Sequence, residues 1–281
     1  MARINLTGHI PGLIACSFLA GLALFPLHLQ GQAYPQLQEN QVAWIGEQVY
    51  ANECNRNPAC LTAWNAGENF PSLGIGHFIW YRQDQADIFQ QSFPDLMHFM
   101  QDKGVAIPAW IIAANFAAPW PDRETFQADM QSPRMRELRG FLETHMTEQT
   151  AFIIARFEKA LADIVAGETD AGITAMITRN FNAVAASAPP HGLYALIDYV
   201  NFKGTGVSPR ETYNNQGWGL KQVLAGMGAL EETSASGTAA LEAFVTAARD
   251  ILATRVQNAP ADRNESRWLP GWNNRLTTYL P

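Results

Sequence analysis

The chain has few charged residues and no excess of positive charge. Charged side chains make up 16% of its 281 residues, and the formal net charge is −7. Proteins that bind nucleic acid need a basic surface, so this balance argues against DNA or RNA as a partner. It argues, less strongly, against tight binding to an anionic cell wall. A hydrophobic content of 47% is that of a globular protein, not of a disordered or coiled-coil chain.

Several catalytic and binding motifs are absent from the sequence. It contains no Gly-x-Ser-x-Gly of serine hydrolases and no His-Glu-x-x-His of metalloproteases. The one short glycine turn, Gly74-Ile75-Gly76, lacks the further glycine and the lysine of nucleotide-binding loops. There is no internal repeat and no low-complexity tract. These absences argue against the commonest hydrolase and nucleotide-binding classes.

Long apolar runs are also absent beyond the N-terminus, where no segment reaches the roughly 18 residues that a membrane helix needs. Near the N-terminus, Arg3 precedes a mostly apolar stretch over residues 13–29, and Gly31 and Ala33 are small residues that a signal peptidase reads. We therefore expect residues 1–33 to be a secretory signal. The mature chain, residues 34–281, would be periplasmic or extracellular, with no stable membrane insertion. An uncleaved anchor and lipidation at Cys16 are the alternatives.

Cysteine is scarce, with three in the whole chain. Removal of the signal leaves Cys54 and Cys60, and an even number of cysteines in an exported chain favours a disulfide that closes a short loop. Two cysteines without nearby histidines do not make a zinc site, so we expect no metal and no other cofactor.

Helical patterning dominates the mature chain. We expect helices over residues 38–52, 93–104, 123–131, 134–145, 147–166, 170–186, 192–202, 217–227 and 238–256, and a short one within 267–280. Residues 61–81 are rich in glycine, aromatic and β-branched residues, which predicts a small hairpin or three-stranded sheet. The expected fold class is mainly α (α+β), as a single domain with room for two lobes on either side of a cleft.

One carboxylate, Glu53, lies at a position where the helical pattern predicts a buried apolar residue. Ile45, Val49 and Glu53 follow one another at intervals of four, so Glu53 continues the apolar stripe of the first helix. Partial burial should raise the pKa of Glu53 and keep it protonated near neutrality. A protonated carboxyl beside a glycine-rich hairpin can donate a proton to a leaving glycosidic oxygen. The alternative is an exposed helix end that pairs with Arg56.

The residues after Glu53 carry a family resemblance. They are Trp64, Gly67 and Ser72-Leu73-Gly74-Ile75-Gly76-His77. This arrangement resembles the phage-type lysozymes, in which a helix ends in a catalytic Glu and a hairpin follows with an aromatic residue, an Asp, a Gly and a Thr-Ile-Gly-x-Gly-His signature. Residues 196–204 resemble the inner helix of that family, and residues 272–280 its closing helix. The resemblance implies a lysozyme-like domain that cleaves peptidoglycan, or a related amino-sugar glycan, between N-acetylmuramic acid and N-acetylglucosamine.

The resemblance also implies roles for single residues. Glu53 would be the general acid, and Ser72 stands at the family's Thr, which orients the attacking water. The position of the family's Asp falls on Ala66, which carries no acid. Glu68, two residues later, would return to the same face of the hairpin, and we expect it to replace that Asp. If Glu53 acts alone, the chemistry becomes that of a lytic transglycosylase, which forms a 1,6-anhydro product. A non-catalytic cell-wall glycan-binding protein is the alternative outside the enzymes.

Substrate-binding residues are expected in two places. Trp64, Asn65 and His77 lie around the hairpin, where the histidine can also brace a neighbouring lobe. Asn215 and Trp218 belong to a second cluster of amide and aromatic side chains that suits sugars. Two cations near this cluster are candidates to meet the lactyl or peptide carboxylates of muramic acid, namely Lys203 and Arg210.

Overall fold

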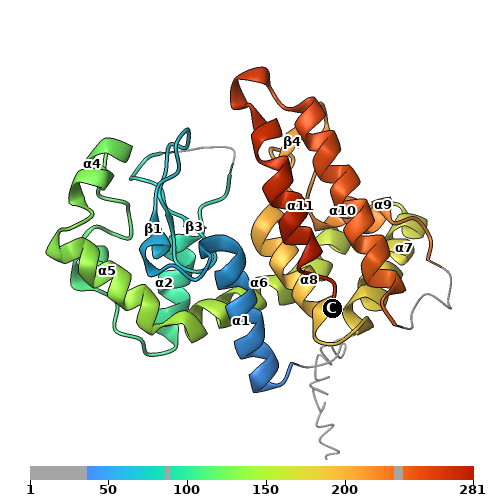
Figure 1. Cartoon of the computed structure of the whole chain (residues 1–281), viewed down its shortest axis with the longest axis horizontal. Coiled ribbons are helices and arrows are strands. Elements are labelled where there is room, and N and C mark those ends of the chain that lie inside the picture. The colour runs from blue at the N-terminus through green and yellow to red at the C-terminus, as the bar shows by residue number, and fades with distance from the viewer. Residues whose placement is uncertain (1–36, 86–88, 231–236) are drawn as a thin grey trace, which may run out of the picture. The chain divides into compact units, whose positions relative to one another are not determined.

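The computed structural model describes residues 37–85, 89–230 and 237–281, and it is mainly helical with a small antiparallel sheet near its N-terminal end (Figure 1). The predicted fold class is confirmed. The predicted secretory signal lies outside the described residues. Within those residues, none of the helices combines the length and the apolar character that crossing a membrane requires.

The helices are α1 (Glu39–Cys54), α2 (Phe93–Asp102), α3 (Ala109–Ala113), α4 (Arg123–Asp129), α5 (Pro133–Thr144), α6 (Met146–Ala166), α7 (Ala171–Ala186), α8 (His191–Lys203), α9 (Leu220–Gly226), α10 (Ala239–Asn258) and α11 (Leu269–Thr277). Short 3-10 turns are η1 (Pro58–Leu61), η3 (Ala261–Arg263) and η4 (Glu265–Arg267). The strands are β1 (Thr62–Ala63), β2 (Ser72–Leu73), β3 (Phe78–Ile79), β4 (Thr212–Tyr213) and β5 (Gln216–Gly217).

Helix α1 follows the apolar stripe that its sequence predicts. Ile45 and Val49 are fully buried, and Gly46 lets the helix approach α6, because a Cβ at that position would collide with the side chain of Thr150. The helix ends at Asn55, which adopts a left-handed conformation with φ of 46°. Glu53 therefore lies in the last turn, on the buried side of the helix.

The predicted three-stranded sheet is present, with the antiparallel order β1-β2-β3. Its second turn, residues 74–77, is anchored by α6, since the backbone N–H of Ile75 donates to Oε1 of Gln149 at 2.9 Å. Gly74 has a φ of 72°, and a Cβ there would collide with the same oxygen of Gln149. The turn therefore needs glycine, and it places His77 opposite the end of α1.

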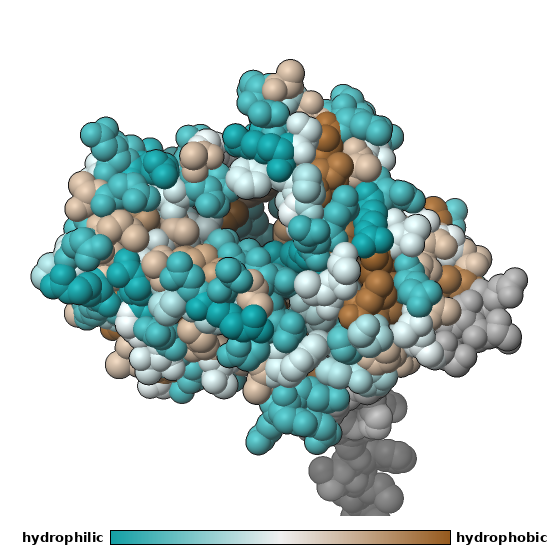
Figure 2. All heavy atoms as spheres, viewed as in Figure 1, coloured by the Kyte–Doolittle hydropathy of each residue, from teal (hydrophilic) through white to brown (hydrophobic). Residues whose placement is uncertain are grey.

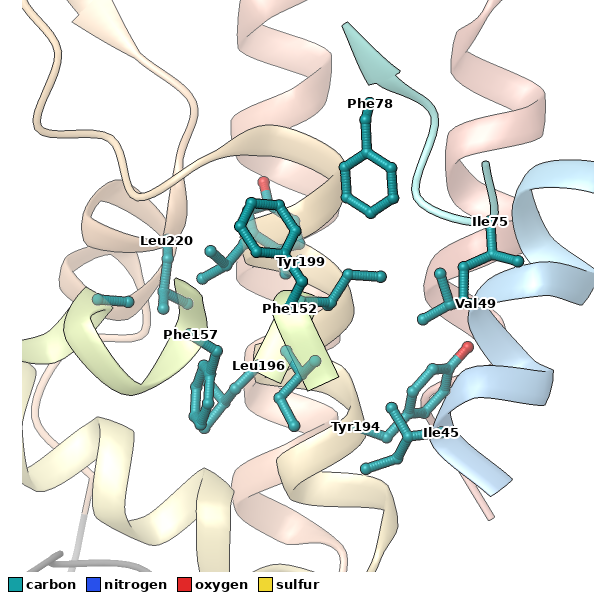
Figure 3. Packing of buried hydrophobic residues seen from close by; sticks show 14 of the residues in the cluster. Ile45, Val49, Ile75, Phe78, Phe152, Phe157, Tyr194, Leu196, Tyr199 and Leu220 are labelled. Carbon is teal, nitrogen blue, oxygen red and sulfur yellow. The ribbon is translucent and has the colours of Figure 1, made fainter. Parts of the chain in front are cut away.

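Helix α6 packs against α1 and α2 on one side and against α7 and α8 on the other (Figure 1). Phe152 on this helix meets Phe78 of β3 at a ring separation of 5.5 Å, and Phe157 stacks on Phe181 of α7 at 5.6 Å. Figure 3 shows this apolar packing running from Ile45 and the sheet turn through α6 to α8. The core is thus shared by the sheet side, meaning strands β1–β3 with helices α1–α5, and by the C-terminal helices α7–α11.

Two segments differ from the sequence-based expectation. Residues 106–121, expected to be irregular, contain the short helix α3. Strands β4 and β5 form a hairpin within a region expected to be a loop and the start of a helix. Its turn residues, Asn214 and Asn215, both have positive φ, 50° and 60°. An Asn-Asn pair is a hairpin signal of this kind, because asparagine tolerates the left-handed region that a type I′ turn requires.

Candidate functional site

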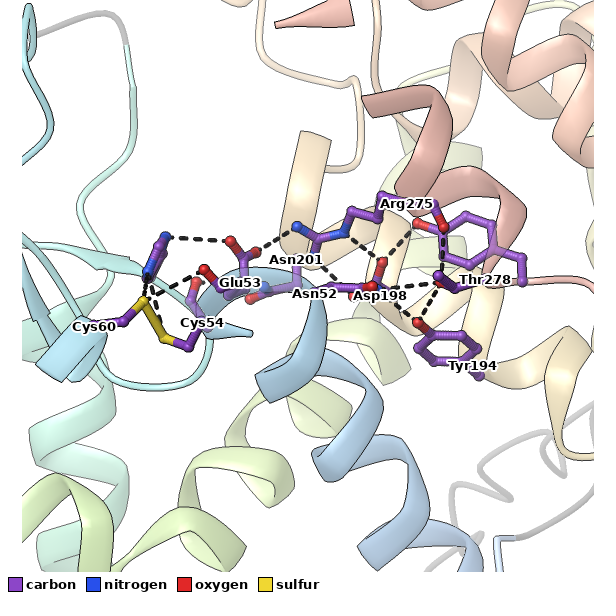
Figure 4. Close-up of polar contacts among 12 residues, drawn as sticks. Asn52, Glu53, Cys54, Cys60, Tyr194, Asp198, Asn201, Arg275 and Thr278 are labelled. Atoms are coloured by element: carbon purple, nitrogen blue, oxygen red, sulfur yellow. Dashed lines mark hydrogen bonds and ion pairs between the residues drawn. A yellow bond between two sulfur atoms is a disulfide. The ribbon is translucent and has the colours of Figure 1, made fainter. Parts of the chain in front are cut away.

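The carboxylate of Glu53 is largely buried and is contacted by two side chains. Its side chain is 13% exposed, Nη1 of Arg275 donates to Oε1 at 2.7 Å, and Nδ1 of His77 lies 3.2 Å from Oε2 (Figure 4). The alternative of an exposed helix end paired with Arg56 is wrong, since Arg56 pairs with Glu47 at 3.5 Å. The burial that the apolar stripe predicts is therefore present.

The expected protonation of Glu53 is wrong for the protein without substrate. Burial alone would raise the pKa of Glu53, but the positive charges of Arg275 and His77 and their hydrogen bonds outweigh it and lower the pKa to about 2. Glu53 is therefore an anion at neutral pH. The apolar stripe predicts the desolvation but contains nothing about Arg275 and His77, which come from other segments of the chain.

Arg275 is fixed by a carboxylate behind it. Nε and Nη2 of Arg275 donate to the two oxygens of Asp198, each at 2.8 Å, and the hydroxyl of Tyr279 donates to Oδ2 of Asp198 at 2.7 Å. Asp198 is fully buried, and the ring of Phe202 lies 4.2 Å from the guanidinium carbon. A bidentate Arg–carboxylate pair has a defined geometry, so Nη1 is held in place toward Glu53.

His77 is held on its other side by the predicted disulfide. Cys54 and Cys60 lie at disulfide distance, with Cα atoms 5.3 Å apart, and Nε2 of His77 is 3.1 Å from Sγ of Cys60. The expectation that no histidine lies near the cysteines is wrong, because the sheet turn carries His77 to them. Metal binding by cysteine requires the thiolate, so the paired sulfurs do not act as metal ligands. In Figure 4 the contacts form one row from the cysteines to Asp198.

Two more polar links flank this row. Nδ2 of Asn201, one turn after Asp198 on α8, donates to the carbonyl of Gly76 at 3.3 Å. Asn52, next to Glu53, donates to the hydroxyl of Tyr194 at 2.6 Å, and that hydroxyl lies 2.9 Å from Oγ1 of Thr278. Helix α8 therefore braces the glycine turn, and Asn52, next to Glu53, ties α1 to α8 and to the end of α11.

The hairpin residues predicted for the site lie in the first turn and in β2. Trp64 is buried against Phe126, and its indole N–H donates to the carbonyl of Glu68 at 2.8 Å. Asn65 donates to the carboxylate of Glu68 at 3.2 Å. Ser72 is buried in β2. The hydrogen bonds of Glu53 go to Arg275 and His77, so the carboxylates of Glu53 and Glu68 are held by different partners.

The second predicted cluster belongs to the β4–β5 hairpin. Asn215 lies exposed in its turn. Trp218 is buried, with the guanidinium of Arg255 4.1 Å from its ring and the ring of Tyr213 at 4.7 Å. Arg255 in turn pairs with Glu265 through hydrogen bonds of 2.7 and 2.9 Å. The indole of Trp218 is thus covered by protein.

Figure 2 shows the surface hollowed between the sheet side and the C-terminal helices. Two contacts join these two parts: Arg263 lies over the ring of Phe89 at 5.8 Å, and Gly67 of the first hairpin turn lies beside Arg267. Two other cavities, of about 350 and 380 Å³, lie near His98 and near Trp44 and do not include Glu53.

The residues that sequence reasoning missed are Arg275 and its supports, Asp198 and Tyr279. They lie in the two segments that resemble the family's inner and closing helices, yet nothing in their spacing connects them with Glu53. Comparisons with family models, curated proteins and solved structures found no match for this chain.

Proposed function

We propose that this chain is an exported glycosidase that cleaves peptidoglycan, with Glu53 as its catalytic carboxylate. The observation that carries the proposal is the state of Glu53: a sheltered carboxylate at the end of α1, held between Arg275 and His77 beside the glycine turn of a small sheet. A glycosidase needs a positioned carboxyl group next to the scissile oxygen. The lysozyme-like order of Glu53, Gly74 and His77 in the sequence supports the same reading.

Glu53 must gain a proton before it can act as a general acid, because its pKa without substrate is about 2. A glycosidic oxygen carries no proton, so it can contact Oε1 only after Glu53 has taken a proton from water, which replaces the hydrogen bond from Nη1 of Arg275. Arg275 keeps its bidentate partner Asp198, so losing one hydrogen bond does not leave it unpaired. Once that contact is weakened and water is displaced, burial dominates and raises the pKa of Glu53. Substrate entry would thus convert the anion into the acid.

A lytic transglycosylase is the second candidate, and the position of Ala66 favours it. This residue is exposed in the hairpin turn and offers no carboxylate where the lysozyme resemblance places an Asp. A single carboxyl can donate and then withdraw a proton while the sugar's own 6-hydroxyl attacks. Cleavage by Glu53 alone would then leave 1,6-anhydro ends instead of reducing ends.

The test is digestion of purified peptidoglycan with mass spectrometry of the soluble fragments. Reducing ends support hydrolysis, 1,6-anhydro ends support the transglycosylase, and intact wall with retained protein supports a binding protein. Glu53→Gln should reduce cleavage at least a hundredfold. The matched control is Glu47→Gln, an exposed carboxylate on the same helix, which should leave the rate unchanged. Undiminished cleavage by Glu53→Gln removes the assignment.

A further inference from the structure

Lys203, at the end of α8, has an ammonium group surrounded by aromatic rings. Nζ lies 3.5 Å from the ring centre of Trp272 and 4.0 Å from that of Phe202. The residue is only partly exposed. Across the described ranges 37–85, 89–230 and 237–281, no carboxylate forms an ion pair with Lys203. A sheltered cation without an anionic partner is an unusual feature of a folded protein.

The neighbouring cations already have their partners. Arg275 is matched by Asp198 and Glu53, and Arg255 is matched by Glu265. Burial lowers the pKa of Lys203 well below its usual value, and Arg255 and Arg275 lower it further, while Glu265 and Glu53 act in the opposite direction. The three carboxylates of this cluster, Glu53, Asp198 and Glu265, all bind the two arginines, so none of them forms an ion pair with Lys203. Glu53 still interacts electrostatically with Lys203.

The rings beside Lys203 continue toward the surface along α11. Trp268 precedes Trp272 by four residues, which places both on one side of the helix and about 6 Å apart along its axis. Arg275 follows Trp272 by three residues on the same side. Trp268 is 44% exposed, a high value for this residue type. The order from solvent inward is therefore the partly exposed indole of Trp268, with the guanidinium of Arg267 4.8 Å from its ring centre, then the indole of Trp272 beside Lys203, and then Arg275, which holds Glu53.

We propose that Lys203 binds a carboxylate of the glycan substrate, with Trp272 and Trp268 as the surface on which the sugar rings lie. This inference rests on the proposed function and names its substrate class: a chain whose sugars carry acidic groups, not neutral chitin. The carboxylate can come from the free lactyl group of N-acetylmuramic acid or from the stem peptide. Aromatic faces with one well-placed charged group are a common design of ligand sites. A carboxylate at this position would also give Lys203 the direct ion-pair partner that it lacks.

Three substrates separate the two sources of the carboxylate. Intact peptidoglycan has peptide carboxylates and a lactyl group capped as an amide; amidase-stripped glycan has free lactyl carboxylates; stripped glycan converted to methylamides is neutral. We expect Lys203→Met to lower kcat/KM at least tenfold on the charged substrate that supplies the group. On neutral glycan the change should stay below twofold. Lys203→Arg should restore part of the loss, and Lys159→Met, an exposed lysine on α6, is the matched control.

Binding gives a readout that does not depend on cleavage. Affinities for soluble peptide-bearing, stripped and methylamidated strands are measured by titration of tryptophan fluorescence, and thermal unfolding checks that Lys203→Met is folded. Wild-type protein should prefer the charged strand that supplies the carboxylate over the methylamidated strand by at least tenfold, and Lys203→Met should abolish that preference. An equal loss on charged and neutral glycan, or no loss on either charged substrate, overturns the inference. Absence of any cleavage by the wild type together with a Lys203-dependent charge preference rejects the proposed function but keeps this site.

Discussion

Glu53 is held as an anion by groups that lie 24 and 222 positions later in the chain, His77 and Arg275. Its burial would favour the neutral acid, yet two nearby positive groups reverse that preference. The same contacts that keep Glu53 ionised also stabilise the fold, because the unfolded chain lacks them. Stability should therefore depend on the protonation of this one residue.

The first prediction concerns pH. The pKa of Glu53 falls from 4.5 to about 2 on folding, so its charged form contributes stability that is present above pH 4.5 and lost as the pH drops toward 2. The full contribution is about 3 kcal/mol from the size of that shift. Denaturant unfolding of the wild type and Glu53→Gln from pH 7 to pH 2 should show the wild type's advantage shrinking by this order. A pH-independent difference between the two proteins would contradict the assignment.

The second prediction concerns Arg275→Met. This change leaves Asp198 buried without its cation, and removing one partner of a buried ion pair costs roughly 3–5 kcal/mol of the free energy of unfolding. Arg249→Met is the control, because Arg249 is exposed and its contact with Thr277 lies at the surface. That control should cost less than about 1 kcal/mol. Equal losses in the two variants would mean that the buried ion pair between Arg275 and Asp198 does not stabilise the fold.

These residues show which features of the site are predictable from the sequence. The positions of Ile45 and Val49 predict the buried side of α1, so the shelter of Glu53 is predictable from helical spacing. The charge state of Glu53 is not, since Arg275 comes from the other end of the chain and no local pattern connects the two. Lys203 is noticed in the sequence as a cation near polar residues, but its placement against Trp272 depends on how α8 and α11 pack.

At the scale of elements, short-range signals predict most helices and the first sheet. The Ser132-Pro133 start of α5 is one example, where Oγ of Ser132 accepts from the N–H of Met135 at 3.0 Å. The β4–β5 hairpin is missed because its strands have two residues each, too few for an alternating pattern. The Asn214-Asn215 pair is the remaining sign of a hairpin, and the same pair is equally typical of a loop.

The third prediction concerns the glycine turn that carries His77. Gly74→Ala should lower the free energy of unfolding by roughly 2–4 kcal/mol, because alanine is strained at positive φ and its Cβ collides with Gln149. Gly104→Ala is the matched control, since Gly104 also has positive φ but has open space around it. Its cost should be about 1 kcal/mol. Chemical denaturation of both variants gives the difference, and equal costs would show that the contact with Gln149 does not matter.

At the scale of the whole described chain, α6 belongs to the core on both of its sides. Phe152 packs against the sheet and Phe157 against α7, while Glu53 and Asn52 tie α1 to the C-terminal helices. An expected single domain with two lobes remains a prediction, and it has a thermodynamic consequence. Elements that share one core unfold together, whereas two independent domains unfold in separate steps.

The fourth prediction tests that consequence with Phe157→Ala. Removing a fully buried phenyl ring should cost roughly 3–5 kcal/mol. Because Phe157 lies on the helix that joins both sides, the whole transition should move, whether it is followed by far-UV circular dichroism or by near-UV signals of the tryptophans. Most of those tryptophans, such as Trp80 and Trp120, lie on the sheet side, far along the chain from α7.

The control for this variant is Phe141→Ala on α5, whose ring is only partly buried and packs at a tilt against His145. It should shift the same transition by a smaller amount, since less apolar area is lost from the core. Two separate transitions in the wild type, of which Phe157→Ala moves only one, would mean that the sheet side and the C-terminal helices are independent domains. In that case the contact between Glu53 and Arg275 would be an interface between domains, and substrate could open the site by separating them.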